Sequence, residues 1–272
     1  MVVPLIRREN GAYSAHVFGE QRRFTEADLA SVEKEVRNAG FYPYRTDPDE
    51  MAVLEADDTC VDRLFLRLMR ESVSHWIELA TERLKPQGIR CYVSPGNDDH
   101  LSIDDLLKSA DYLVPCEEEV VPLTDQHEML TFGWSTPTPW KSPRECSEAE
   151  LGQRIESLAG RVSNMERCVF NLHSPPFNTA IDLAPQLDET LRPLMRGGQI
   201  MMAPVGSQAV RASIEHHQPL LALHGHIHES RGFTYLGRTP CINPGSEYGD
   251  GILRGCLIDL NGNRAPFTLV SG

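Results

Sequence analysis

The chain has 272 residues, of which 40% are hydrophobic and 24% are charged; this length and composition predict one large domain, residues 1–272, with a substantial core. The formal net charge of -13 disfavours nucleic-acid binding through neutralised phosphates, and no apolar run or leader predicts a membrane span or secretion, so a cytoplasmic protein is favoured. Seven scattered cysteines without a CxxC pair argue against a disulfide framework or a zinc ribbon.

Residues 1–88 are predicted to be the helix-rich N-terminal part. A strand over residues 2–6 and a second over 13–18 flank the hairpin turn Asn10-Gly11. Thr25 caps a helix that runs to about Asn38, and a short helix follows at 48–56. Apolar residues at helical spacing predict the longest helix over 59–84, with a face that packs on a sheet.

Residues 89–272 carry the features that point to chemistry. Strands are predicted over 89–93, 112–114, 120–123, 129–132, 168–172 and 221–225, and near 232–236, 240–243, 252–260 and 265–270. Helices are predicted over 103–110, from the capping box at Ser147 to about 162, and over 206–217. The long connection at 174–205 is predicted to contain one helix, and such connections are often functional. This alternation of helices and strands, followed by a β-rich tail, predicts a layered α/β sandwich.

Three of the predicted strands end in residues that can bind a metal. Ile89 to Val93 leads into Gly96-Asn97-Asp98-Asp99, the strand at 168–172 ends on His173, and Leu221 to Leu223 leads into His224-Gly-His226-Ile-His228. On an extended backbone, the spacing of His226 and His228 points both rings to one side. Since ligands bind beyond the carboxyl ends of the strands in open α/β sheets, neighbouring strands would bring these side chains together. The alternative for each motif alone is a polar loop after a strand.

The order of these blocks resembles the second half of the calcineurin-like metallophosphoesterase family. The family pattern runs Asp-x-His, Gly-Asp, Gly-Asn-(His/Asp)-(Asp/Glu), His and Gly-His-x-His; its last three blocks occur here within residues 89–250, together with Asn243-Pro-Gly-Ser246. The resemblance implies a layered α/β/β/α sandwich and a dinuclear site of divalent transition metals (Mn, Fe, Zn or Ni). It also implies hydrolysis of phosphate mono- or diesters by a metal-bridging hydroxide.

The resemblance also assigns roles to single residues. Asn97, His173 and His226 match three ligands of one metal, and His228 matches a ligand of the other. Asp98 stands where the family often has the histidine that donates a proton to the leaving group, so Asp98 is the candidate catalytic residue; a carboxylate would donate only with a raised pKa. Asp99 matches an acidic residue that orients its neighbours. His224 is expected to face away from the site and to support it.

The first two family blocks, Asp-x-His and Gly-Asp, do not occur before Gly96. We therefore expect either an N-terminally incomplete form of a longer protein, lacking the first strands of the sandwich, or a degenerate relative. Two functions follow: a metallophosphoesterase whose activity is impaired by the missing ligands, or a non-catalytic member of the same fold that binds a metal or a partner. Serine hydrolase, P-loop and dinucleotide-binding motifs are absent.

Overall fold

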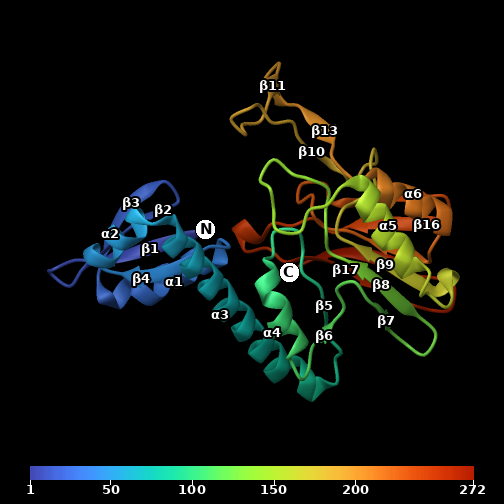
Figure 1. Cartoon of the computed structure of the whole chain (residues 1–272), viewed down its shortest axis with the longest axis horizontal. Coiled ribbons are helices and arrows are strands. Elements are labelled where there is room, and N and C mark those ends of the chain that lie inside the picture. Colours follow the sequence, from blue (N-terminus) through green and yellow to red (C-terminus); the bar gives the residue numbers. More distant parts are fainter.

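The computed structural model describes residues 1–272 and begins with a small sheet of its own (Figure 1). Its strands, in the spatial order β3-β2-β1-β4, are β1 (Val2–Arg7), β2 (Tyr13–Val17), β3 (Glu20–Phe24) and β4 (Tyr42–Thr46). With α1 (Leu29–Asn38), this sheet encloses a separate cluster of nine buried apolar residues. β1, β2 and α1 confirm the predicted elements. β3 and β4 were not predicted, because β3 is mostly charged and β4 contains Pro43.

Two helices lead from this sheet to the rest of the chain. α2 (Pro48–Ala56) starts with a proline in its first turn, and Asp47 caps it by accepting a hydrogen bond from the Glu50 N–H. α3 (Asp58–Leu84) confirms the predicted long helix and connects the N-terminal sheet to the larger body of the molecule (Figure 1). Its buried face packs on the apolar side chains of the following segment, with Met69 and Val73 in a common cluster with Ile103 and Leu107.

A six-stranded sheet, ordered β15-β16-β14-β9-β8-β7, forms the centre of the body. Its strands are β7 (Val120–Pro122), β8 (Glu128–Phe132), β9 (Cys168–Leu172), β14 (Leu221–Leu223), β15 (Gly232–Leu236) and β16 (Thr239–Asn243). The four inner strands are parallel and the two edge strands are antiparallel to their neighbours. The β9–β14 pairing places the ends of the strands that precede His173 and His226 side by side, as predicted.

The strand before Gly96 does not belong to this sheet. β5 (Tyr92–Val93) pairs only with β6 (Val114–Pro115) in a separate two-stranded parallel sheet. The expectation that all three ligand-bearing strands are neighbours in one sheet is therefore wrong for this strand. The Gly96 turn approaches His173 and His226 from the separate β5–β6 sheet and not from a neighbouring strand of the six-stranded sheet.

Different layers cover the two faces of the central sheet. α5 (Glu148–Ala159) and α6 (Gln208–His217) pack on one face, and their fully buried Ile155 and Ile214 belong to the largest apolar cluster. The hairpin of β17 (Arg254–Ile258) and β18 (Phe267–Ser271) packs on the other face, against Val169, Leu221 and Ile242 among others. The α/β class is confirmed, with six helices and several sheets; α4 (Asp104–Lys108) completes the helices.

The long connection after His173 contains no helix, so that prediction is wrong. It forms two antiparallel pairs that extend from the body in Figure 1. These are β10 (Leu183–Pro185) with β13 (Met202–Pro204), and β11 (Met195–Arg196) with β12 (Gln199–Ile200). Gly197 and Gly198 both have positive φ angles, as a two-residue hairpin turn requires. This local turn chemistry, and the prolines that flank the strands, override the weak helical pattern of the segment.

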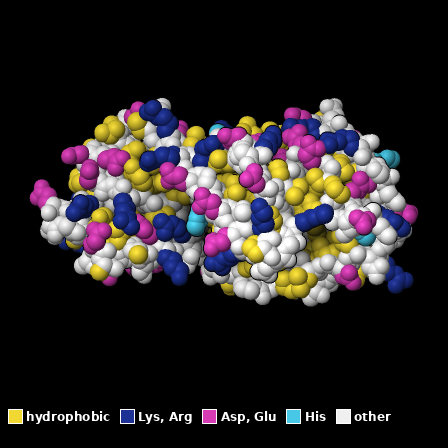
Figure 2. Space-filling view, turned by 90° about the horizontal axis from the view of Figure 1, so that it is seen from below, with side chains coloured by type: hydrophobic (Ala, Val, Ile, Leu, Met, Phe, Trp, Pro, Cys, Tyr) yellow, Lys and Arg dark blue, Asp and Glu magenta, His cyan; other side chains and the backbone are white.

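Charges of both signs are mixed on the face shown in Figure 2, with apolar areas between them. A field of one sign, as nucleic-acid binding by phosphate neutralisation requires, is not visible on this face. No helix combines the length and the apolar composition that crossing a membrane would require.

Candidate metal centre

Three predicted ligands, Asn97, His173 and His226, lie in contact with one another. His173 Nε2 lies 2.8 Å and His226 Nδ1 lies 3.1 Å from Asn97 Oδ1. The two imidazole rings are 5.2 Å apart between centroids, at 61° to each other. In the sequence, His173 lies 76 positions and His226 lies 129 positions after Asn97. The fold therefore gathers them from three separate segments, each of which follows a strand.

The backbone at each motif makes this approach possible. A Cβ on Gly96 would lie 2.8 Å from the His173 ring, so only glycine lets the turn come this close. The His173 N–H donates to the Phe132 carbonyl and the Gly225 N–H donates to the His173 carbonyl, which ties β8, β9 and β14 together just beyond their ends. His226 has a φ of +63°, a left-handed conformation that is uncommon for a residue other than glycine. The backbone is thus strained at His226, which is one of the candidate ligands.

That turn corrects the prediction made for the two histidines of Gly-His-x-His. The chain leaves the extended conformation after Leu223 and His226 has a positive φ, so the alternation of side chains along a regular strand does not apply to this pair. The His226 ring lies against Asn97 and His173, whereas the exposed His228 ring packs edge-on against Tyr248, with centroids 5.6 Å apart. The structure therefore brings together Asn97, His173 and His226 and leaves His228 beside them, in a neighbouring pocket.

Asp98 orients the amide of Asn97. Asp98 Oδ1 accepts hydrogen bonds from Ser142 Oγ at 2.6 Å and from Asn97 Nδ2 at 3.3 Å, and Asn97 Nδ2 also donates to Ser142 Oγ at 3.0 Å. Because both amide hydrogens point at these acceptors, Oδ1 faces the imidazoles. Asp99 closes the same turn by accepting from the Gly96 N–H at 2.8 Å, and burial raises the pKa of its carboxyl above the usual range.

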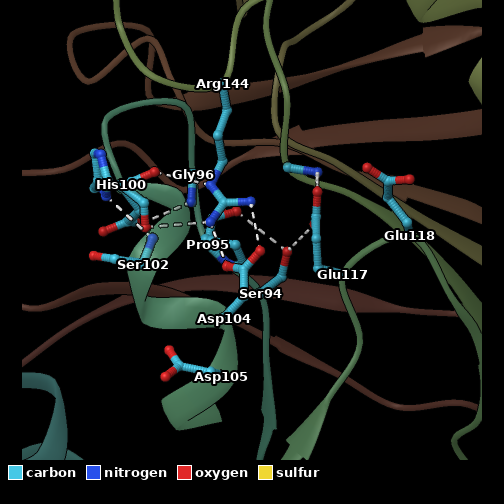
Figure 3. Close-up of polar contacts among 12 residues, drawn as sticks. Ser94, Pro95, Gly96, His100, Ser102, Asp104, Asp105, Glu117, Glu118 and Arg144 are labelled. Atoms are coloured by element: carbon cyan, nitrogen blue, oxygen red, sulfur yellow. Dashed lines mark hydrogen bonds and ion pairs between the residues drawn. The ribbon is translucent and has the colours of Figure 1, made fainter. Parts of the chain in front are cut away.

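The irregular loop at 136–146 supplies partners that the sequence did not reveal. Arg144 is almost completely buried; its Nε donates to the Asp99 carbonyl at 2.9 Å and its guanidinium pairs with Asp104 (Figure 3). Its own N–H donates to the Asn97 carbonyl at 3.1 Å. Figure 3 also shows Glu117, whose carboxylate accepts from Ser94 Oγ and from the Gly133 N–H. Arg144 and Glu117 thus fix the turn that carries Asn97 from two sides.

His224 holds the segment around His173. Its Nδ1 donates to the carbonyl oxygens of Leu172 at 2.9 Å and of Ser174 at 3.0 Å, the two residues that flank His173. Its Nε2 is buried without a partner, which suits a lone pair better than a second N–H. The ring is therefore a neutral imidazole protonated on Nδ1, and it confirms the supporting role expected for this residue.

Burial lowers the pKa of His224 to about 4, and lowers that of His173, with help from the neighbouring histidines, to about 3. An unfolded histidine has a pKa near 6.5. Between this pH and about pH 4, the unfolded chain therefore binds a proton at His224 and the folded chain does not. We expect the contribution of His224 to the free energy of unfolding to fall by about 3 kcal/mol between pH 6.5 and pH 4. Urea unfolding across this range would measure it. In His224→Asn, whose amide can replace the Nδ1 donor but does not titrate, the slope should be shallower; an unchanged slope would contradict the assignment.

The three converging donors fit a divalent metal. Metal–ligand bonds near 2.1 Å place neighbouring donor atoms about 3.0 Å apart at right angles and about 3.4 Å apart at tetrahedral angles. The two N···O distances here, 2.8 and 3.1 Å, are hydrogen-bond distances and lie near the lower of these values. Imidazole nitrogen and amide oxygen suit borderline metals, and two depressed histidine pKa values keep the rings neutral and ready to bind. The donor atoms that converge here are two imidazole nitrogens and one amide oxygen.

Comparisons with known proteins bear on the fold. No protein-family model matches the chain. The uncharacterized protein MJ1162 of Methanocaldococcus jannaschii is 28% identical over 152 residues, which are 55% of this chain and 61% of that protein, so the match spans less than two thirds of the relative. A solved structure at 15% identity covers 99% of this chain and 97% of its own, with a TM-score of 0.52. TT1561 of Thermus thermophilus, at 15% identity, covers 75% of this chain and 79% of its own, with a TM-score of 0.48. At 15% identity, the likeness with a TM-score of 0.52 shows a shared fold alone.

Proposed function

We propose that this chain binds a divalent transition metal through Asn97, His173 and His226 and acts as a metal-dependent phosphoesterase. The observation that carries the proposal is the meeting of two imidazole nitrogens with one amide oxygen, within 3.1 Å, from three strand ends. A metal held there would supply a Lewis acid for the phosphate ester and lower the pKa of a nearby water. His228, in the adjoining pocket, is the candidate ligand for a second metal.

The residues around the donors contribute positioning and electrostatics. Asp98 and Ser142 keep Asn97 Oδ1 directed at the two rings. A metal would bind lone pairs on His173 Nε2 and His226 Nδ1, so each neutral ring would then carry its single proton on its other nitrogen, Nδ1 of His173 and Nε2 of His226. Since the net charge of the chain is -13, the metals would supply much of the positive charge that an anionic ester needs. Asp98 is the candidate proton donor to the leaving group, a role that requires a protonated carboxyl.

The protein should retain metal after gel filtration and hydrolyse p-nitrophenyl phosphate or bis(p-nitrophenyl) phosphate when Mn²⁺, Zn²⁺ or Ni²⁺ is added. Elemental analysis and the release of nitrophenolate measure the two properties separately. Metal binding together with turnover would support the phosphoesterase. Metal binding without turnover would favour the second candidate, a non-catalytic metal-binding member of this fold. Absence of both would refute the metal centre.

A further inference from the structure

A pocket of about 280 Å³ adjoins the candidate metal centre at His228. Besides His228 it is lined by residues of three segments, namely Glu229, Arg231, Gly245, Ser246, Glu247 and Arg254. Ligand pockets usually span roughly 300 to 1,000 Å³, so this one suits a small group. None of its lining side chains is apolar. A flat aromatic or acyl group would strip water from these charged walls without replacing their hydrogen bonds.

The walls of this pocket are held by defined contacts. Asn243 is fully buried; its Nδ2 donates to the Ile227 carbonyl at 2.8 Å, and its Oδ1 accepts from the Gly245 N–H at 2.9 Å. The Ser246 N–H donates to the His228 carbonyl. At Gly245, whose φ is +72°, a Cβ would lie 2.8 Å from Arg231 Cβ, so glycine is required for the two segments to approach. The pocket is therefore a built feature of the fold rather than a gap between loops.

Several polar groups of the walls have no partner within the protein. Arg231 and Glu229 make no ion pair and no side-chain hydrogen bond, although they carry opposite charges. Arg254 is paired with Glu247 and with Ser271 Oγ, but its Nε is buried without an acceptor. The free groups thus include donors, on Arg231 and Arg254, and an acceptor, on Glu229. The formal charges of the two arginines and two glutamates cancel, so the pocket offers no excess charge to an anion.

We infer that this pocket binds a hydroxyl-bearing leaving group, so that the substrate class is the phosphate ester of a small polyol or sugar. A hydroxyl can accept from the Arg231 guanidinium and donate to the Glu229 carboxylate, which matches walls of mixed sign better than an anion or an apolar group does. The position beside His228 places such a group next to the proposed phosphoryl site. This inference rests on the proposed function, because the pocket selects the alcohol only if the metal centre binds the phosphate.

A larger hollow of about 600 Å³ along α3 is a weaker candidate for a ligand site. Its walls include Arg70, which already binds the Ser102 carbonyl and Asp105, and it contains none of the candidate ligands. The pocket at His228 differs because Glu229 and Arg231 make no contact with another charged side chain and because it contains His228, the candidate ligand of a second metal.

Calorimetric titration of the metal-loaded chain with glycerol 3-phosphate and with ethyl phosphate tests the inference, because both are alkyl monoesters but ethyl phosphate lacks free hydroxyls. We expect glycerol 3-phosphate to bind at least about 10-fold more tightly. Arg231→Ala and Glu229→Gln should reduce this preference to about twofold or less, whereas Arg238→Ala, at an ion pair with Glu166 in another part of the surface, should keep it. Equal binding of the two esters by the wild type, or an unchanged preference in both pocket variants, would overturn the inference and leave the phosphoesterase proposal intact. Failure of both esters to bind would refute the proposed phosphoester site itself, and the inference with it.

Discussion

Replacing either His173 or His226 with alanine is expected to lower the affinity of the chain for a divalent metal by at least about 100-fold. Loss of a residue that only supports a ligand typically costs 10- to 100-fold, so loss of a ligand should cost more. Each ring supplies one of only three converging donors, and two donors hold a transition metal poorly. Metal content after dialysis, together with calorimetric titration with Zn²⁺ or Mn²⁺, measures the effect.

Two other histidines provide matched controls for this experiment. His228→Ala should retain the first metal, because the His228 ring lies against Tyr248 and not at the Asn97 oxygen. His16→Ala, on an exposed position of β2, should change nothing. The near-ultraviolet circular dichroism of every variant shows whether its tertiary packing is intact. Wild-type metal content in both His173→Ala and His226→Ala would refute the ligand assignment; loss in His16→Ala as well would show that the assay reads general unfolding.

His173 and His226 could be found from the sequence because each follows an apolar strand and belongs to a family pattern with fixed order. Parallel strands pair through such runs, and β9 and β14 are buried between two layers, so their sequence signal is strong. Asn97 was found by the same pattern. That its strand lies in a different layer was not predictable, because β5 has only two paired residues and its pairing depends on tertiary contacts.

Arg144 and Glu117 were missed for a different reason. Arg144 lies in a proline-rich loop without periodicity, where an arginine is normally exposed, and Glu117 begins a run of three glutamates that reads as a solvated turn. Only the folded chain shows that Arg144 is buried, that Glu117 is half-buried, and that they bind Asp99 and Ser94 on either side of Asn97. The left-handed conformation of His226 was equally hidden, because a histidine in that region is uncommon and propensity argues against it.

The burial of Arg144 leads to a second strong expectation, that Arg144→Met destabilises the fold by roughly 3 to 5 kcal/mol. Folded domains are stable by only about 5 to 15 kcal/mol in total. The substitution leaves the Asp104 carboxylate without its cation and removes a hydrogen bond to the Asp99 carbonyl. Because the Arg144 backbone also binds the Asn97 carbonyl, a folded fraction of the variant should hold metal more weakly. Urea unfolding followed by tyrosine and tryptophan fluorescence measures the change in free energy.

A double variant separates the contribution of the unpaired charge from that of lost packing in the cost of Arg144→Met. If the cost comes mainly from an unpaired carboxylate, Arg144→Met combined with Asp104→Asn should be more stable than Arg144→Met alone, because the uncompensated charge is then gone. Arg238→Met, which breaks an exposed pair with Glu166, should cost no more than about 1 kcal/mol. Arg144→Lys should fall between these limits, since an ammonium keeps the charge but cannot reach Asp104 and the Asp99 carbonyl with the same planar set of donors. A cost below about 1 kcal/mol for Arg144→Met would show that the guanidinium is not what fixes the turn that presents Asn97 to the two imidazoles.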